Sequence, residues 1–340
     1  MESYRIFISY SHEDYDTAKA VSDHLEKLKF RPIWDPNLPK GLPFSDQIKL
    51  GIAYAHVFLP IITKSANDRP WVQQEIGYAM GLNVPVLPLA IGVTPVGMTK
   101  ELQALIIEAD LSDLKRLTGN QIETLVSEAQ LNSSATCRTV QFAEDRTRML
   151  ADYANRILTL NEAGCVRQRA ALTSFSIPDR PIDHPDWAAF AGDDPLAPAF
   201  RQLLRDERRA LQKHARKAGC HLMINLGFDF PKQGANSRKT RLRTLAEFLE
   251  SMPDDTVRIA IRRADAAHNI VLVGDWLLAE SMAPGTGSGW LHTAFTTHGT
   301  TVLKRQREFD EDLIGMLDEA GVSPEQSRAW AIGELKSEIG

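Results

Sequence analysis

Apolar and polar positions in the first part of the chain follow two different periods. Residues 5–10 (Arg-Ile-Phe-Ile-Ser-Tyr) are rich in β-branched and aromatic types, which predicts a strand. From about Tyr15 to Lys29 the apolar residues recur at helical spacing, which predicts an amphipathic helix with one face on a sheet. The polar run from Ser11 to Asp14 lies between them and suits the cap of that helix.

The same alternation of strands and helices continues along the chain. The pattern predicts strands at 31–34, 56–62 and 85–90 and helices at 45–55 and 70–80. The run at 56–62 is almost continuously apolar, which is typical of a strand buried on both faces. Strands that alternate with helices in this way predict right-handed crossovers and a parallel sheet covered by helices on both faces, an α/β fold.

Beyond this first domain the pattern changes twice. Residues 116–165 are mostly polar with helical spacing, and we expect a helical connector there. Residues 166–340 again mix apolar strands, such as Ile270 to Val273, with long helices, which predicts a second α/β or α+β domain. The predicted organisation is therefore a first domain at 1–115, a connector at 116–165 and a second domain at 166–340.

Length and composition agree with two globular domains. The chain has 340 residues, 43% of them hydrophobic and 24% charged. The formal net charge of −5 argues against binding of nucleic acid over the whole protein surface. Binding of nucleic acid by one part of the chain stays open. The first residues lack a signal-peptide pattern and no apolar run is long enough for a membrane helix, so we expect a cytoplasmic protein with no membrane partner. Three widely separated cysteines predict neither a disulfide framework nor a metal site.

Candidate functional residues follow the ends of the predicted parallel strands. Ligands of open α/β sheets bind beyond the carboxyl ends of the strands, where Tyr10 and Ser11 follow the first one. The second strand leads into residues 35–44, a loop with three prolines and one glycine that cannot form regular structure. After the third strand, Trp71 and Glu75 are four residues apart and share one face of a helix.

Together these residues resemble the TIR (Toll/interleukin-1 receptor-like) family over about residues 4–115. Each element alone is a weak signal, but all of them occur in the family's order on alternating strands and helices. One departure is Pro70, where the family often has a serine, and it affects only the local loop geometry. The resemblance rests on Phe7-Ile-Ser-Tyr-Ser11 followed by Asp14, on Trp34-Asp35 with Gly41, and on Ser65 ahead of Trp71 and Glu75.

The resemblance implies a flavodoxin-like, doubly wound sheet and, for the enzymes of the family, cleavage of NAD by a glutamate that matches Glu75. One carboxylate suffices for this chemistry, because it stabilises the ribosyl cation while nicotinamide leaves without a proton. Trp34, Trp71 or Tyr10 could stack on nicotinamide or adenine. NAD is then the substrate, with no metal and no other cofactor. The expected substrate-binding residues are Tyr10, Ser11, Trp34, Asp35, Gly41, Phe44 and Trp71.

The same resemblance also implies partners. In the family, the proline-rich loop of one TIR domain often completes the site of its neighbour, so we expect self-association. The second domain would then sense an unidentified activating ligand, and such bacterial proteins commonly resemble antiphage effectors. The products would be nicotinamide and either ADP-ribose or a cyclic isomer.

Other interpretations stay open. The first domain could be a non-catalytic interaction module, with Glu75 a solvated helix carboxylate, Trp71 a packing residue and Asp35 the start of a turn. In a third interpretation, the second domain holds the main activity: His292, His298, Lys304 and Asp310 faintly resemble phospholipase D-like folds, without the family's His-x-Lys spacing. A basic helix around 198–217 is usually a solvated face and less often a binding site for an anionic ligand.

Overall fold

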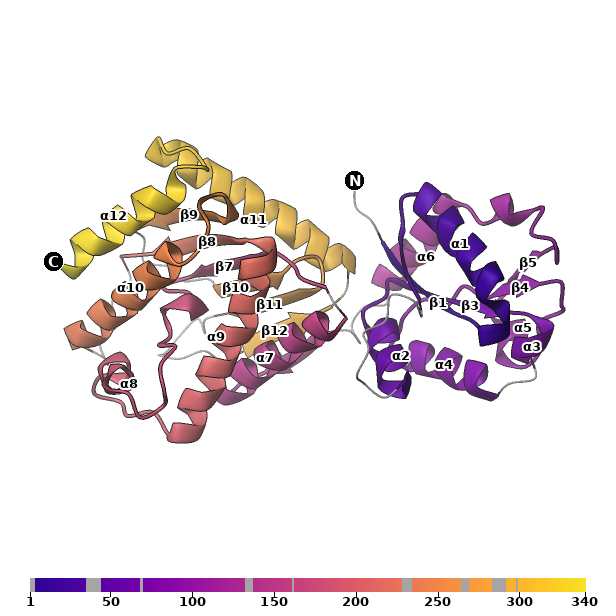
Figure 1. The fold of residues 1–340 in the computed structure, drawn as a ribbon, viewed down its shortest axis with the longest axis horizontal. Coiled ribbons are helices and arrows are strands. Elements are labelled where there is room, and N and C mark those ends of the chain that lie inside the picture. Colours follow the sequence, from indigo (N-terminus) through magenta and orange to yellow (C-terminus); the bar gives the residue numbers. More distant parts are fainter. Residues whose placement is uncertain are drawn as a thin grey trace. The chain divides into compact units, whose positions relative to one another are not determined.

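The chain folds into two compact units. The computed structural model describes residues 4–34, 44–67, 70–131, 137–160, 162–227, 234–263, 269–282, 292–297 and 299–340. One unit comprises Met1–Cys137 with His298–Thr300, and the other comprises Arg138–Thr297 with Thr301–Gly340 (Figure 1).

The described strands of the first unit form one parallel sheet. Their order, β2-β1-β3-β4-β5, is that of a flavodoxin-like doubly wound fold. Because β1 has β2 on one side and β3 on the other, the chain reverses direction across the sheet between β1 and β3. Ligands of doubly wound sheets bind at this switch point. The strands are β1 (Arg5–Ser9), β2 (Arg31–Ile33), β3 (Val57–Ile62), β4 (Leu89–Ile91) and β5 (Leu105–Ile107).

Helices cover both faces of this sheet, which confirms the predicted fold class (Figure 1). On one face lie α1 (Tyr15–Lys27) and α6 (Gly119–Leu131), and on the other lie α2 (Phe44–Ala53) and α4 (Pro70–Gly81). The short helices α3 (Lys64–Asn67) and α5 (Met98–Glu101) complete the unit.

The alternation of side chains along β1 assigns its residues to these two faces. Ile6, Ile8 and Tyr10 belong to the hydrophobic cluster that contains residues of α1 and α6. Phe7 and Ser9 therefore point to the opposite face, since successive side chains of a strand alternate. Ser9 is the last residue of the strand, so it lies at the carboxyl edge on the face that α2 and α4 cover.

The segment 116–165, expected as a helical connector, is distributed between the two units. Ile122 and Val126 of α6 are buried in the core of the first unit. By contrast, β6 (Cys137–Val140) joins the sheet of the second unit, and α7 (Ala143–Thr159) packs there against α9 (Pro198–Ala218). Polar, helical spacing gave no indication of which core each helix joins.

The second unit is a mixed sheet with helices packed against it, within the predicted α/β or α+β range. The described strands have the order β6-β12-β11-β10-β7-β8-β9. The pairs β7-β8 and β8-β9 are parallel, whereas β10 is antiparallel to both of its neighbours, β7 and β11. These strands are β7 (Val166–Ala170), β8 (Cys220–Asn225), β9 (Val257–Arg262), β10 (Asn269–Val273), β11 (Leu277–Met282) and β12 (His292–Thr296).

Long helices supply the second core. Residues of α11 (Gly299–Ala320) pack on the sheet, where Phe309 and Leu313 contact a cluster that includes Met223 and Leu272. The helix α10 (Gly234–Glu250) packs against α8 (Pro185–Ala191) and α12 (Ser327–Ile339). Within the described residues, no helix is both long enough and apolar enough to cross a membrane.

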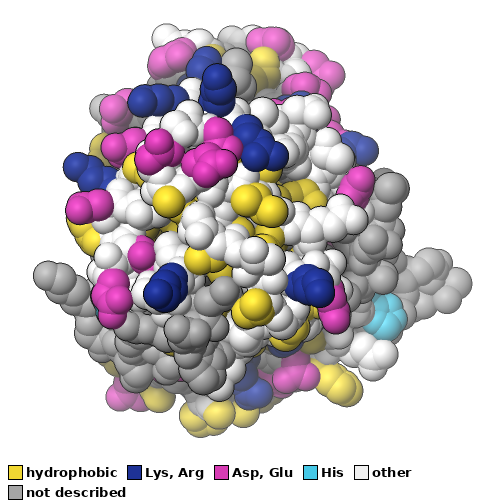
Figure 2. Space-filling view, turned by 90° about the vertical axis from the view of Figure 1, so that its right-hand side faces the viewer, with side chains coloured by type: hydrophobic (Ala, Val, Ile, Leu, Met, Phe, Trp, Pro, Cys, Tyr) yellow, Lys and Arg dark blue, Asp and Glu magenta, His cyan; other side chains and the backbone are white. Residues whose placement is uncertain are grey.

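One face of the first unit is shown in Figure 2. Acidic and basic side chains are interspersed over its described part, with hydrophobic side chains between them. The exposed large hydrophobic residues in the described part of this unit come from several places along the chain, two of them from α4; they are Tyr15, Tyr78, Met80, Val96 and Ile106. Exposed hydrophobic side chains in small numbers are ordinary on protein surfaces.

We expect Gly51→Ala to destabilise the first unit by about 1–3 kcal/mol, the usual range for overpacking a core. A Cβ on Gly51 of α2 would lie 2.2 Å from Cε2 of Phe7, a buried ring stacked on Phe58. Urea unfolding measures the change. The control is Gly77→Ala on α4, where a Cβ meets nothing within 4 Å, and which should stabilise the helix by up to about 1 kcal/mol. Equal effects of the two substitutions would contradict the packing described here.

Candidate functional site

The candidate site centres on a buried carboxyl at the switch point of the first sheet. Glu75 lies in α4, which follows β3, and only 9% of the residue is exposed. Ser9, at the end of β1, donates a hydrogen bond from its Oγ to Oε2 of Glu75 over 2.5 Å. A side-chain hydrogen bond thus joins β1 and α4, which flank the switch point.

Burial changes the ionisation of Glu75. Loss of water around the carboxyl raises its pKa from 4.5 to about 8, and the hydrogen bond from Ser9 lowers the pKa by less. At neutral pH the group is therefore mainly protonated in this conformation. A carboxyl whose pKa burial has raised so far is typical of functional sites.

A second set of hydrogen bonds ties the carboxyl edges of β1 and β3 together. Oδ2 of Asp14, just before α1, accepts hydrogen bonds from Oγ1 of Thr63 and Oγ of Ser65, each over 2.7 Å. The Thr63 hydroxyl also accepts a hydrogen bond from the Ala66 amide over 3.2 Å. Charged acceptors make stronger hydrogen bonds, so this cluster fixes the start of α1 relative to the start of α3. Thr63 is not part of the sequence motif, but it directly follows β3, where the sequence predicts functional residues.

The aromatic candidates divide between the two faces of the sheet. The rings of Tyr10 and Trp34 lie 5.8 Å apart, those of Tyr15 and Trp34 lie 5.4 Å apart, and both Tyr10 and Trp34 are 8% exposed. Tyr10 and Trp34 belong to the cluster with α1 and α6, on the face opposite to Ser9. Trp71 is half-buried and lies on α4, the same helix as Glu75. It is therefore the aromatic candidate for stacking beside the carboxyl.

The remaining sequence candidates have different placements. Ser11 is fully buried, and within the described part of the chain its Oγ has no hydrogen-bond partner. Asp35 and Gly41 lie outside the described residues. Phe44 begins α2, but its side chain is outside the described set as well. The described residues contain no group of three or more His, Cys, Asp or Glu side chains that could hold a metal ion.

The residues that resemble phospholipase D-like folds do not converge in the described structure. Both carboxylate oxygens of Asp310 accept hydrogen bonds from Arg167 over 2.8 Å, and Oδ1 lies 2.9 Å from Nδ1 of His221. Burial raises the pKa of Asp310, but the contacts with His221 and Arg167 together outweigh this effect and lower the pKa to about 2. His292 and Lys304 are exposed on β12 and α11, and His298 lies outside the described residues.

The fold and this site define a doubly wound α/β domain with a buried carboxyl at the switch point. Residues 6–126 match the family model described as "TIR domain". The chain therefore carries a TIR domain, and its second unit lies outside the match. A search of curated proteins finds no match.

The comparison with solved structures finds similarity to the TIR domains of another protein. That structure is titled "Structure of the activated Roq1 resistosome directly recognizing the pathogen effector XopQ (TIR domains)". The alignment has 16% sequence identity and a TM-score of 0.25, and it covers 48% of this chain and 86% of the other.

The raised pKa of Glu75 predicts how the stability of the first unit depends on pH. The folded state keeps its proton up to about pH 8, whereas the unfolded state loses it near pH 4.5. The free energy of unfolding should therefore fall as pH rises through this window, by at most about 1.4 kcal/mol per pH unit. Glu75→Gln does not titrate, so its stability relative to the wild type should increase from pH 5 to pH 8.

Urea unfolding at several pH values measures this difference. The matched control is Glu123→Gln, which removes an exposed carboxylate on α6 of the same unit. Its stability relative to the wild type should stay nearly constant. If Glu75→Gln behaved like this control, the carboxyl would not be buried as described.

Proposed function

We propose that the TIR domain is an NAD glycohydrolase that breaks the bond between nicotinamide and ribose. The observation that supports this most is the position of Glu75: a single buried carboxyl at the switch point, hydrogen-bonded by Ser9. Cleavage of this bond needs one anion beside the ribose and no acid for the leaving group, since nicotinamide leaves as a neutral molecule. A water-poor site strengthens the attraction between that anion and the developing cation.

NAD and water supply all the atoms and electrons that this reaction needs. The electron pair of the glycosidic bond moves to the nicotinamide nitrogen and neutralises its positive charge. C1′ of the ribose then carries oxocarbenium character, which ionised Glu75 stabilises. Water adds at C1′ and releases a proton to give ADP-ribose; addition of a nucleophile from the same molecule gives a cyclic isomer.

Binding of NAD would prepare the carboxyl for this role. In the resting domain Glu75 holds a proton because burial raises its pKa to about 8. The nicotinamide ring of NAD is positively charged, and an opposite charge nearby favours the ionised carboxylate. Glu75 would therefore lose its proton as the substrate binds, while Ser9 continues to donate to the carboxylate.

Other parts of the domain complete the proposal. Trp71 offers an aromatic surface on the helix that carries Glu75, and the loop at residues 35–44 would contribute from a neighbouring copy after self-association. An activating ligand in the second unit would control that assembly, in a cytoplasmic antiphage effector. A TIR domain that only assembles, without cleaving NAD, is the alternative that the experiment below separates from the enzyme.

Full-length protein clustered at high density on beads, mixed with NAD and monitored for nicotinamide, tests the proposal. We expect the wild type and Glu123→Gln to release nicotinamide. Glu75→Gln and Glu75→Ala should lose about 100-fold or more of the rate, as when one preorganised charge or donor is removed from an active site. No release by the clustered wild type would support the interaction module and contradict the enzyme.

The pH dependence of the same reaction tests the state of Glu75. If the free enzyme must ionise Glu75, kcat/KM should rise about tenfold per pH unit up to its pKa of about 8. Ser9→Ala removes the hydrogen bond that lowers this pKa, so the midpoint should move to higher pH. Ser22→Ala, a buried serine of α1, should leave the midpoint unchanged. An identical profile for Ser9→Ala would show that Ser9 does not position the carboxylate.

A further inference from the structure

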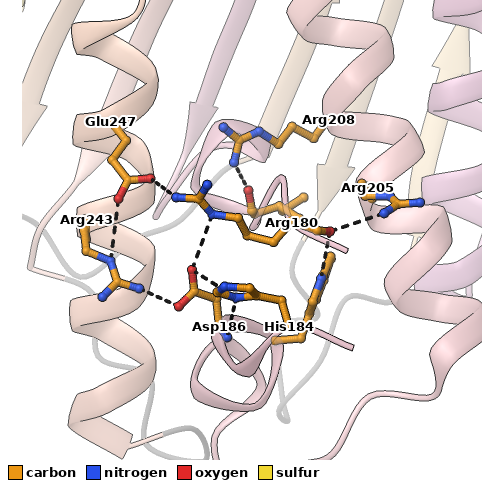
Figure 3. Close-up of polar contacts among 9 residues, drawn as sticks. Arg180, His184, Asp186, Arg205, Arg208, Arg243 and Glu247 are labelled. Carbon is orange, nitrogen blue, oxygen red and sulfur yellow. Dashed lines mark hydrogen bonds and ion pairs between the residues drawn. The ribbon is translucent and has the colours of Figure 1, made fainter. Parts of the chain in front are cut away.

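The second unit contains a cluster of arginines around the start of α8, and one of them, Arg208, is buried. Three arginines of α9, at positions 201, 205 and 208, fall on one face of the helix because their spacing is four and three residues. Each donates to main-chain carbonyl oxygens of the segment that precedes α9. Figure 3 shows Arg205 and Arg208 approaching this segment from α9, with Arg180 between them and α10.

Two arginines of this cluster, Arg180 and Arg243, are balanced by ion pairs. Arg243 of α10 lies 2.8 Å from Asp186, and Arg180 lies 3.4 Å from Glu247. Longer contacts of 3.8 Å join Arg180 to Asp186 and Arg243 to Glu247 (Figure 3). Two cations and two anions thus form a closed set.

Arg208 and Arg205 are outside this set. Arg208 is 5% exposed; in the part of the chain that the structure describes it donates from Nη1 to the carbonyl oxygen of Ile177, and its Nε has no partner. Arg205 donates to the carbonyl oxygen of Arg180 over 3.3 Å and to Oε1 of Gln202 over 2.7 Å, and its Nε also has no partner among the described residues. All of these acceptors are neutral.

Arg167 shows the usual arrangement of a buried arginine, in which a carboxylate balances its charge. The side chain of Arg167 is 7% exposed, and it makes two hydrogen bonds to the carboxylate of Asp310. Arg208 is similarly buried, but no ion pair or hydrogen bond joins it to a described carboxylate. Burial lowers its pKa to about 10, although the charges of Asp179 and Glu247 act in the opposite direction. Buried charges in proteins are normally paired, because removing an ion from water is costly without a counter-charge.

We propose that Arg205 and Arg208 form a binding site for a phosphate-type oxyanion. A guanidinium presents its donors in a planar fork that matches two oxygens of such an anion, and both side chains retain Nε donors for it. The anion would supply the negative charge that the surrounding carboxylates do not, because Asp186 and Glu247 are paired with Arg180 and Arg243, and Asp179 is paired with Arg209.

The source of the anion is either free phosphate or the phosphate group of a small metabolite. All residues of the site belong to the second unit, so the proposal does not depend on NAD cleavage by the first. The alternative is that these arginines only hold the carbonyl groups of the segment before α9.

Isothermal titration of the full chain at constant ionic strength, with inorganic phosphate, AMP and adenosine as three separate probes, tests the site. We expect phosphate and AMP to bind the wild type and adenosine not to bind. A higher affinity for AMP would identify a phosphate ester as the source, whereas equal affinities would identify phosphate itself. Arg205→Gln and Arg208→Met should each raise the Kd of both anions about tenfold or more, as expected for loss of a charge-assisted contact.

The control is Arg216→Gln, which removes an exposed arginine from the same helix and should leave the Kd unchanged. Arg205→Gln keeps the test decisive if Arg208→Met does not fold, because Arg205 is less buried than Arg208. Failure of both phosphate and AMP to bind the wild type would overturn the proposal. Equal affinity of the wild type and Arg205→Gln for these anions would overturn it too. The arginines would then only hold the carbonyl groups of the segment before α9.

Discussion

The burial of Glu75 against Ser9 is the interaction on which the account of the first unit depends. It exists because the order of the parallel strands puts the end of β1 beside β3, and because α4 returns over the same face of the sheet. Away from water, the carboxyl keeps its proton to about pH 8. The Asp14 hydrogen bonds to Thr63 and Ser65 hold the neighbouring strand ends in place, so the position of the carboxyl is determined by the fold itself.

The two units each bury a charged group, and the consequences differ with the chemistry of the group. Glu75 can become neutral by binding a proton, so its burial is tolerated. A cation close to the carboxyl would favour loss of that proton. An arginine does not lose its proton at physiological pH, even where burial lowers the pKa as far as it does for Arg208. Under the two proposals, Glu75 would ionise beside the positively charged nicotinamide ring, and Arg208 would bind an anion.

Periodicity and strand order made the first sheet and the placement of Glu75 on α4 predictable. Glu75 and Trp71 share a helix because they are four residues apart, a relation that sequence shows directly. Ser9 and Tyr10 are adjacent, so the alternation of a strand sends them to opposite faces, and this explains why Tyr10 packs with Trp34 and not with the carboxyl. The distribution of 116–165 between two cores and the burial of Arg208 were not predictable, because both depend on contacts between residues far apart in sequence.

The central claim is that Glu75 is a buried carboxyl whose proton is released when NAD binds. A ¹³C NMR titration of glutamate carboxyl groups in the full chain, with Glu75→Gln to assign the signal, measures its pKa directly. The account predicts a midpoint near pH 8 without ligand and a lower midpoint in the presence of a non-cleavable analogue with a charged nicotinamide ring. A midpoint near the ordinary value of 4.5, unchanged by the analogue, would contradict it.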